Sequence, residues 1–295
     1  KDYIRTPAAD LHLLSRGFYY PASVQRPRLR SSAQNAPKNK TLKIFITLKT
    51  KQLMNSNETL QQMQQLKFNG MAASYTEQLQ LPIHQQLEAH ELIAQLMQAE
   101  LLSRNNERTA YYLRLAKLRM PAIAEQVECS PARNFTKQQL ATLLEGNYLQ
   151  QGGNILITGA TGCGKSYLAC ALGHHACLQG HKTTYLNMNR LIEKITLAKL
   201  DGTYIKFLNY LERQTLIILD DFGLQALNQD VKLALLQILE DRYAKRAVII
   251  TSQLPVSKWY EYINEPTLAD AIMDRMTAQV HRIELKGESR RNKKS

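Results

Sequence analysis

The eight residues from Gly159 to Ser166 constrain this chain more than any others, because they fit the pattern G-x-x-x-x-G-K-[ST]. An apolar run, 155–157, precedes them and predicts a buried strand, and an Ala- and Leu-rich run, 167–173, follows and predicts a helix. A strand that turns through glycines into a helix leaves backbone N–H groups unpaired, and their partial positive charge receives phosphate oxygens. The stretch therefore predicts a phosphate-binding loop at the start of a helix.

Every residue of this loop is a candidate for nucleotide binding. They are Gly159, Ala160, Thr161, Gly162, Cys163, Gly164, Lys165 and Ser166. We expect Lys165 to reach the β- and γ-phosphates of ATP and the Ser166 hydroxyl to bind Mg²⁺. A chance glycine turn is the competing interpretation, and the flanking strand and helix argue against it.

Two adjacent acidic residues, Asp220 and Asp221, follow the apolar strand predicted at 216–219. Nucleotide hydrolases with a phosphate loop have a carboxylate beside the metal ion. It lies at the carboxyl end of a buried strand next to the loop. We predict that Asp220 binds Mg²⁺, directly or through water, and that Asp221 polarises the attacking water as a general base. The competing interpretation is that the two acids only begin a loop.

Two further residues are candidates for catalysis. Gln253 follows the next apolar strand, and we expect it to hydrogen-bond the γ-phosphate or to position the water; loop capping by the neighbouring Thr and Ser is the alternative. Arg275 lies in a predicted helix, and its fixed charge is suited to the γ-phosphate of a neighbouring subunit. A salt bridge with Asp274 or Glu284 is the alternative for Arg275.

Strands and helices alternate from about residue 135 onward. The predicted strands are 154–158, 183–186, 216–219 and 247–250, with helices between them. This alternation predicts an α/β domain in which a parallel sheet carries helices on both faces, making three layers. A fifth strand is expected at 280–285, and only about 40 residues follow Gln253, which leaves little chain for a helical lid.

Residues 54 to about 125 predict a small all-helical domain ahead of the α/β domain. Gly70 and Pro82 interrupt its helical pattern, and two helices are expected afterwards, at 85–103 and 107–119. The second of these interleaves basic residues with tyrosines. It offers either a solvated charged face or a face for contact with phosphates. Two prolines beyond it predict a linker.

The formal charge of +13 is concentrated in residues 1–53, which contain eleven basic and two acidic side chains. The first methionine is Met54. We predict that residues 1–53 are a translated upstream region or an unstructured basic arm, and a DNA-binding arm is the competing interpretation. Residues 287–295 are expected to form a basic tail.

No apolar run approaches the roughly 18 to 20 residues of a membrane span, so we expect no membrane partner and a cytoplasmic location. The four cysteines contain no C-x-x-C pair. Cys170 and Cys177 lie one heptad apart on the predicted helix after the phosphate loop. They are expected to be small buried core residues rather than metal ligands or disulfide partners.

Together these motifs resemble IstB-type transposition helper ATPases of the AAA+ superfamily, relatives of DnaC-type helicase loaders and DnaA-type initiators. The resemblance covers about 54–291 and rests on the run 159–166, the segment LIILDDFG at 216–223, TSQLP at 251–255 with Trp259, Asp274-Arg275 and the ending GESRR at 287–291. It implies an AAA+ domain at 126–286, ATP hydrolysis with Mg²⁺, and a homo-oligomer on duplex DNA. It also implies recruitment or stimulation of an IstA-type transposase, with Arg275 at the position of the arginine finger.

The chain departs from the AAA+ pattern at two of these positions. Asp221 stands where many AAA+ proteins have glutamate, and Gln253 stands where the sensor residue is often asparagine. Two other functions stay open at this point. A DnaC-like helicase loader shares every nucleotide motif and differs in its protein partner. A monomeric kinase or small-molecule transferase needs no arginine from a second subunit.

Overall fold

The computed structural model describes residues 56–289. The segment 1–53 and all but the first residues of the tail 287–295 lie outside this range, so the predictions for them are not tested. Apart from the first residues of its first helix, the described chain belongs to one compact unit, Thr59–Ser295. In the described part, no helix is long and apolar enough to cross a membrane.

Five parallel strands form the sheet, in the order β2-β3-β4-β1-β5. They are β1 (Asn154–Gly159), β2 (Thr183–Asn187), β3 (Leu216–Phe222), β4 (Ala247–Ser252) and β5 (Val280–Leu285). Every strand predicted from the sequence is present, and β3 and β4 run two or three residues further than expected. Because all neighbouring pairs are parallel, the carboxyl ends of the strands meet at one edge of the sheet.

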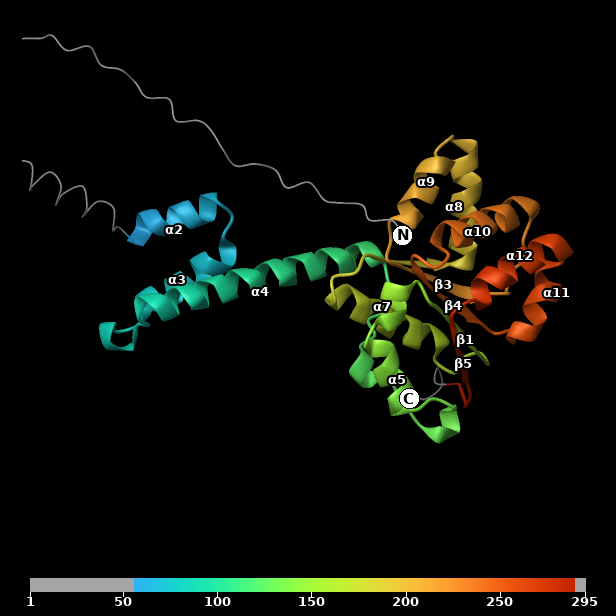
Figure 1. Ribbon diagram of the computed structural model, residues 1–295, viewed down its shortest axis with the longest axis horizontal. Coiled ribbons are helices and arrows are strands. Elements are labelled where there is room, and N and C mark those ends of the chain that lie inside the picture. The colour runs from blue at the N-terminus through green and yellow to red at the C-terminus, as the bar shows by residue number, and fades with distance from the viewer. Residues whose placement is uncertain (1–55, 290–295) are drawn as a thin grey trace, which may run out of the picture. The chain divides into compact units, whose positions relative to one another are not determined.

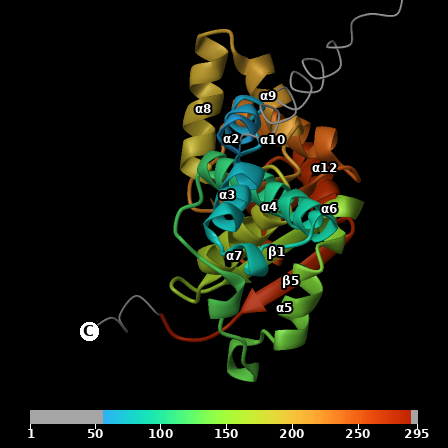
Figure 2. The same ribbon diagram turned by 90° about the vertical axis from the view of Figure 1, so that its left-hand side faces the viewer.

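Helices cover both faces of the sheet, as the alternating pattern predicts (Figure 1). Alternate strand residues divide between two cores: Leu156 and Leu219 pack with α8, α10 and α12, whereas Ile155 and Ile218 pack with α5 and α7. Figure 2 shows β5 at the edge of the sheet beside α5. The helices of this domain are α5 (Lys137–Leu144), α6 (Asn147–Gln151), α7 (Lys165–Leu178), α8 (Met188–Leu200), α9 (Tyr204–Glu212), α10 (Gln229–Arg242), α11 (Trp259–Ile263) and α12 (Pro266–Thr277).

The sheet has a three-layer α/β architecture, and the described residues after β5, 286–289, contain no helix that would form a lid. Of the cysteines, Cys170 and Cys177 are fully buried on α7 and unpaired, as expected. Helix α9 was not foreseen in the sequence analysis.

In the described part of the chain, three α-helices precede the α/β domain: α2 (Ser56–Gln65), α3 (Asn69–Gln80) and α4 (Ala89–Ala116). The prediction of separate helices at 85–103 and 107–119 is wrong, because α4 is one helix of 28 residues. No glycine or proline lies between the two segments, and Glu100 pairs with Arg104 one turn later at 2.7 Å, which favours a continuous helix there. The carboxyl end of α4 packs against β2 and α7.

The helical pattern is interrupted near Gly70, as predicted, since α2 ends at Gln65 and Gly70 is the second residue of α3. A Cβ atom at this position would lie 2.4 Å from the carbonyl oxygen of Ala99 on α4, so glycine lets the two helices approach closely. The buried carboxylate of Glu100 accepts the N–H groups of Gly70 and Met71, at 2.9 and 3.2 Å, and so satisfies free donors at the start of α3.

Arg242, at the end of α10, is fully buried and lies at the amino-terminal edge of the sheet. Its guanidinium donates hydrogen bonds to four backbone carbonyls, those of Leu211, Gln214, Thr215 and Ala247, at 2.7–3.2 Å. These carbonyls belong to the end of α9 and to the starts of β3 and β4. The side chain of Arg242 therefore holds together the end of α9 and the starts of β3 and β4.

We predict that Arg242→Met lowers the free energy of unfolding by about 3–5 kcal/mol, because several buried carbonyls lose their donors together. Urea unfolding of the full chain measures this loss. Arg246→Met is the matched control, since Arg246 is exposed and four residues away. Equal unfolding curves for the two variants would contradict the structural role of Arg242.

Candidate nucleotide-binding site

The loop between β1 and α7 depends on glycines at two positions. Gly162 and Gly164 have φ angles of 83° and 96°, which L side chains rarely adopt. A Cβ atom at Gly162 would lie 2.2 Å from the hydroxyl of Ser289, and one at Gly164 would lie 2.8 Å from the guanidinium of Arg133. The backbone can therefore form this turn, which opens the first turn of α7 with its free N–H groups, only with glycine at both positions.

Lys165 and Ser166, the first two residues of α7, are already oriented by hydrogen bonds. The buried ammonium of Lys165 donates to the carbonyls of Gly159 and Ala160, both at 2.9 Å. The hydroxyl of Ser166 donates to Asp220 at 2.8 Å. The lysine thus lies against its own loop, at the place from which it would turn toward a bound phosphate.

A bulge in β3 brings the two predicted acids to the same side. Successive residues of a regular strand point to opposite faces. Here the register with β4 shifts between Leu219 and Phe222, and Asp221 has a φ angle of 65°. The bulge re-aims the side chain, and both carboxylates lie 3.1 Å from one guanidinium nitrogen of Arg119.

Asp220 is fully buried and surrounded by donors from four parts of the chain. These are the hydroxyls of Ser166, Tyr185 and Thr251 and the guanidinium of Arg119. Burial raises the pKa of Tyr185, and the Asp220 carboxylate raises it further, so the phenol stays protonated and donates. Burial alone would lower the pKa of Arg119, but its hydrogen bond to Asp220 raises it, so the arginine stays charged.

Asp221 is held by two other contacts besides its pairing with Arg119. The side-chain amide of Asn187 donates to its carboxylate at 2.8 Å, because Asn187 ends β2 in register with Asp220. The backbone N–H of Asp221 donates to the hydroxyl of Thr251 at 3.0 Å. Thr251 therefore supports both acids, accepting from one and donating to the other.

The oxygen donors of this site fit Mg²⁺. A hydroxyl and a carboxylate are hard ligands, and two adjacent ligands of an octahedral Mg²⁺ lie about 3 Å apart. Ser166 and Asp220 place their oxygens 2.8 Å apart. Within residues 56–289 no group of three or more His, Cys, Asp or Glu side chains could hold a metal by itself. A magnesium ion here would take further ligands from water and phosphates, as is usual for this ion.

Gln253 lies beside the phosphate loop. Its side-chain carbonyl accepts a hydrogen bond from the hydroxyl of Thr161 at 2.7 Å. The contact joins the end of β4 to the tip of the loop, where the predicted interaction with the γ-phosphate would take place. The structure thus brings together Lys165, Ser166, Asp220, Asp221 and Gln253.

A cavity of about 710 Å³ opens beside the loop, and a segment interpreted from sequence only as a linker forms one of its walls. Val127, Phe135 and Leu285 give it an apolar part that suits a planar base. Arg133 contributes from the same segment by donating to the carbonyl of Cys163 inside the loop and to that of Glu128 at 3.0 Å. The sequence marks Arg119 only as part of a basic helical face, and no local motif marks Arg133, Tyr185 or Asn187.

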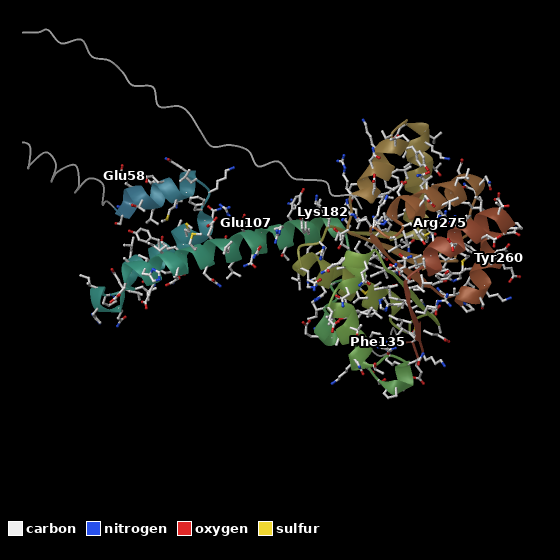
Figure 3. The ribbon with its side chains drawn as sticks, viewed as in Figure 1. Glu58, Glu107, Phe135, Lys182, Tyr260 and Arg275 are labelled. Carbon is white, nitrogen blue, oxygen red and sulfur yellow. The ribbon has the colours of Figure 1, made fainter. Side chains whose placement is uncertain are left out.

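Arg275 does not belong to this cavity. It lies near the end of α12, and its backbone carbonyl accepts from Asn154, the first residue of β1, at 2.8 Å. Since β1 has six residues, the loop lies about 17 Å away along the strand. Figure 3 shows Arg275 well apart from Phe135, which lines the cavity.

Arg275 forms one of the two ion pairs offered as alternatives, the pair with Asp274. Its guanidinium pairs mainly with Glu240 of α10, which the sequence analysis did not name. The carboxylate of Asp274 lies farther away, at 3.7 Å, and Glu284 forms no ion pair with it in the described part of the chain.

A family model described as IstB-like ATP binding protein matches residues 61–295. The insertion-sequence ATP-binding protein y4pL of Sinorhizobium fredii is 41% identical over 242 residues, which are 82% of this chain and 99% of that protein. The ATP-binding protein of insertion sequence IS1162 from Pseudomonas fluorescens is 38% identical over 205 residues, or 69% of this chain and 89% of that protein.

Two solved structures are similar to this one. For a DnaI structure the TM-score is 0.49 at 18% identity, over 57% of this chain and 96% of that chain. For the DnaC helicase loader the TM-score is 0.48 at 18% identity, over 56% and 97%.

We predict that Thr251→Val lowers the free energy of unfolding by about 2–3 kcal/mol, because a buried carboxylate loses a donor and the N–H of Asp221 loses its acceptor. Thermal unfolding without nucleotide measures the change. Thr158→Val is the control, since Thr158 is equally a buried threonine at a strand end, with no side-chain hydrogen bond in the described structure. The prediction fails if the two variants unfold alike.

Proposed function

This chain belongs to the IstB-like ATP binding protein family, and we propose that it is a DNA-binding ATPase that helps a transposase act as part of an insertion sequence. Membership of the family makes it an ATP-binding protein with an AAA+ type α/β domain. Hydrolysis of ATP with Mg²⁺, assembly on duplex DNA and recruitment or stimulation of an IstA-type transposase are the parts that we propose.

The side chains around the loop support hydrolysis. Lys165 and the N–H groups at the start of α7 would neutralise the phosphate oxygens, and Ser166 with Asp220 would hold Mg²⁺. Bound there, Mg²⁺ would neutralise charge on the β- and γ-phosphates. Asp221 is oriented by Asn187 beside this position and would accept the proton of the attacking water.

The position of Arg275 carries the proposal of an oligomer. An arginine side chain cannot span the length of β1 to reach a phosphate on its own loop. Its side chain is about one quarter exposed, so a second subunit has access to it. A γ-phosphate held by Lys165 of one subunit and by Arg275 of the next would stabilise their interface only while it is intact. ATP binding would then favour assembly, and hydrolysis would release it.

We predict that Lys165→Ala weakens ATP binding about a hundredfold or more, because charge-assisted hydrogen bonds to the phosphates are lost. Asp221→Asn should bind ATP normally, lower the rate of hydrolysis about 10²–10⁴-fold and accumulate a DNA-bound assembly. Titration with a fluorescent ATP analogue and single-turnover hydrolysis measure the two effects. Asp230→Asn is a control, since Asp230 is an exposed acid that pairs with Lys199. Normal hydrolysis by Asp221→Asn would remove the assigned base.

Arg275→Ala should bind ATP and fail to hydrolyse it. Mixing it with Lys165→Ala should restore part of the activity, because some interfaces then combine an intact loop with an intact arginine. Glu240→Gln is the matched control: it breaks the ion pair of Arg275 but keeps the guanidinium. If Arg275 serves only to pair with Glu240, both variants will lose the same activity and mixing will restore none.

The whole proposal is tested by the ATPase rate of the full chain, with and without duplex DNA, across protein concentrations that span assembly. A rate that rises steeply with concentration and with DNA supports a shared active site. A rate that depends on neither protein concentration nor DNA points to a monomeric phosphotransferase. Affinity capture with the IstA-type transposase of the same element, compared with a replicative helicase, then distinguishes transposition from helicase loading.

A further inference from the structure

Arg119 occupies the place between the two acids of the nucleotide site. It follows the carboxyl end of α4, two residues beyond the left-handed cap Lys117. One of its guanidinium nitrogens lies 3.1 Å from a carboxylate oxygen of Asp220 and 3.1 Å from one of Asp221. No other cation forms an ion pair with either acid in the described part of the chain.

The two acids need a positive charge. Asp220 is fully buried, and an unpaired carboxylate in such a place is costly to the folded state. The bulge in β3 adds the second carboxylate beside it, so their repulsion has to be offset as well. In this structure Arg119 supplies the charge that Mg²⁺ would supply in a nucleotide complex.

We propose that Arg119 is an internal counter-ion. It pairs with Asp220 and Asp221 when no nucleotide is bound, and its side chain moves away from them when Mg²⁺ binds. This inference rests on the proposed use of Mg²⁺ with ATP. Competition between the guanidinium and the metal would set the Mg²⁺ concentration at which ATP binds tightly. A positive charge would then be present beside the two acids at every stage.

A second cavity gives the displaced side chain room. A groove of about 510 Å³ adjoins Arg119 on the side of α8, and its other charged residues are Lys117, Arg190 and Lys194. Burial lowers the pKa of Lys194, and the charges of Lys117 and Arg190 lower it further. No acid lines this groove. A guanidinium that turned into it would meet like charges, so it would return to the acids when Mg²⁺ leaves.

The backbone around Arg119 is anchored, so the change concerns its side chain. Leu118 and Met120 on either side pack against the small buried cluster of Ala122, Cys170 and Ala171. The side chain of Arg119 is 40% exposed, unlike the buried Asp220 that it contacts. An exposed side chain on a fixed backbone can change rotamer without unfolding the segment.

The test compares the full chain with Arg119→Gln, which keeps polarity without the charge, and with Arg119→Lys, which keeps the charge. Binding of a fluorescent ATP analogue is measured across Mg²⁺ concentrations. We expect Arg119→Gln to reach half-maximal binding at about tenfold less Mg²⁺, since one charge-assisted contact no longer competes. Arg119→Lys should stay near the wild type. Arg213→Met is the control, because Arg213 is an exposed arginine that neither lines the groove nor touches either acid.

A second readout needs no nucleotide. Without a counter-ion, Arg119→Gln should melt at a lower temperature than the wild type, and MgCl₂ alone should restore most of the loss. The same salt should change the wild type and Arg213→Met little. If Arg119→Gln instead weakens ATP binding and leaves the Mg²⁺ midpoint unchanged, Arg119 binds phosphate and the inference is overturned. Both readouts are independent of hydrolysis, so a chain that binds ATP without hydrolysing it would contradict the proposed function and leave this test valid.

Discussion

The buried carboxylate of Asp220 is the point on which the arrangement of this site depends. Hydroxyls from α7, β2 and β4 and one guanidinium from the segment after α4 all donate to it. These elements are far apart in the chain and meet only because the carboxyl ends of parallel strands share an edge. A charge in a low-dielectric interior requires every one of its lone pairs to be satisfied, so the acid fixes the relative positions of the elements that serve it.

Much of the fold could be predicted from local patterns. Strands buried on both faces are continuous apolar runs, and this is why β1, β3 and β4 were found. The edge strands β2 and β5 are shorter or more polar, and they were found from their place in the alternation of strands and helices. The errors lie where tertiary contacts decide. The close approach of Gly70 to Ala99 is one such contact, and it is invisible in sequence. Helix α4 was divided in two because its polar middle segment lacks the apolar stripe, although it also lacks any residue that ends a helix.

The candidate site divides in the same way. The loop, the two acids and Gln253 follow strands directly, so their spacing along the chain predicts their meeting. Arg119 and Arg133 come from a segment without an α-helix or a strand, and Tyr185 and Asn187 come from an edge strand without a motif. What brings them to the site is the register of β2 with β3 and the packing of the linker on α7. Neither leaves a periodic signal in the sequence.

Ser289 has a practical consequence for work on this protein. Its hydroxyl lies where a side chain of Gly162 would have to be, so the chain passes directly over the tip of the phosphate loop as it leaves β5. A group attached to the side chain at position 289 would lie at the tip of the loop that is proposed to receive phosphates. A small fluorophore coupled there would be quenched or shifted as nucleotide enters, whereas an affinity handle for purification belongs on a surface remote from the loop.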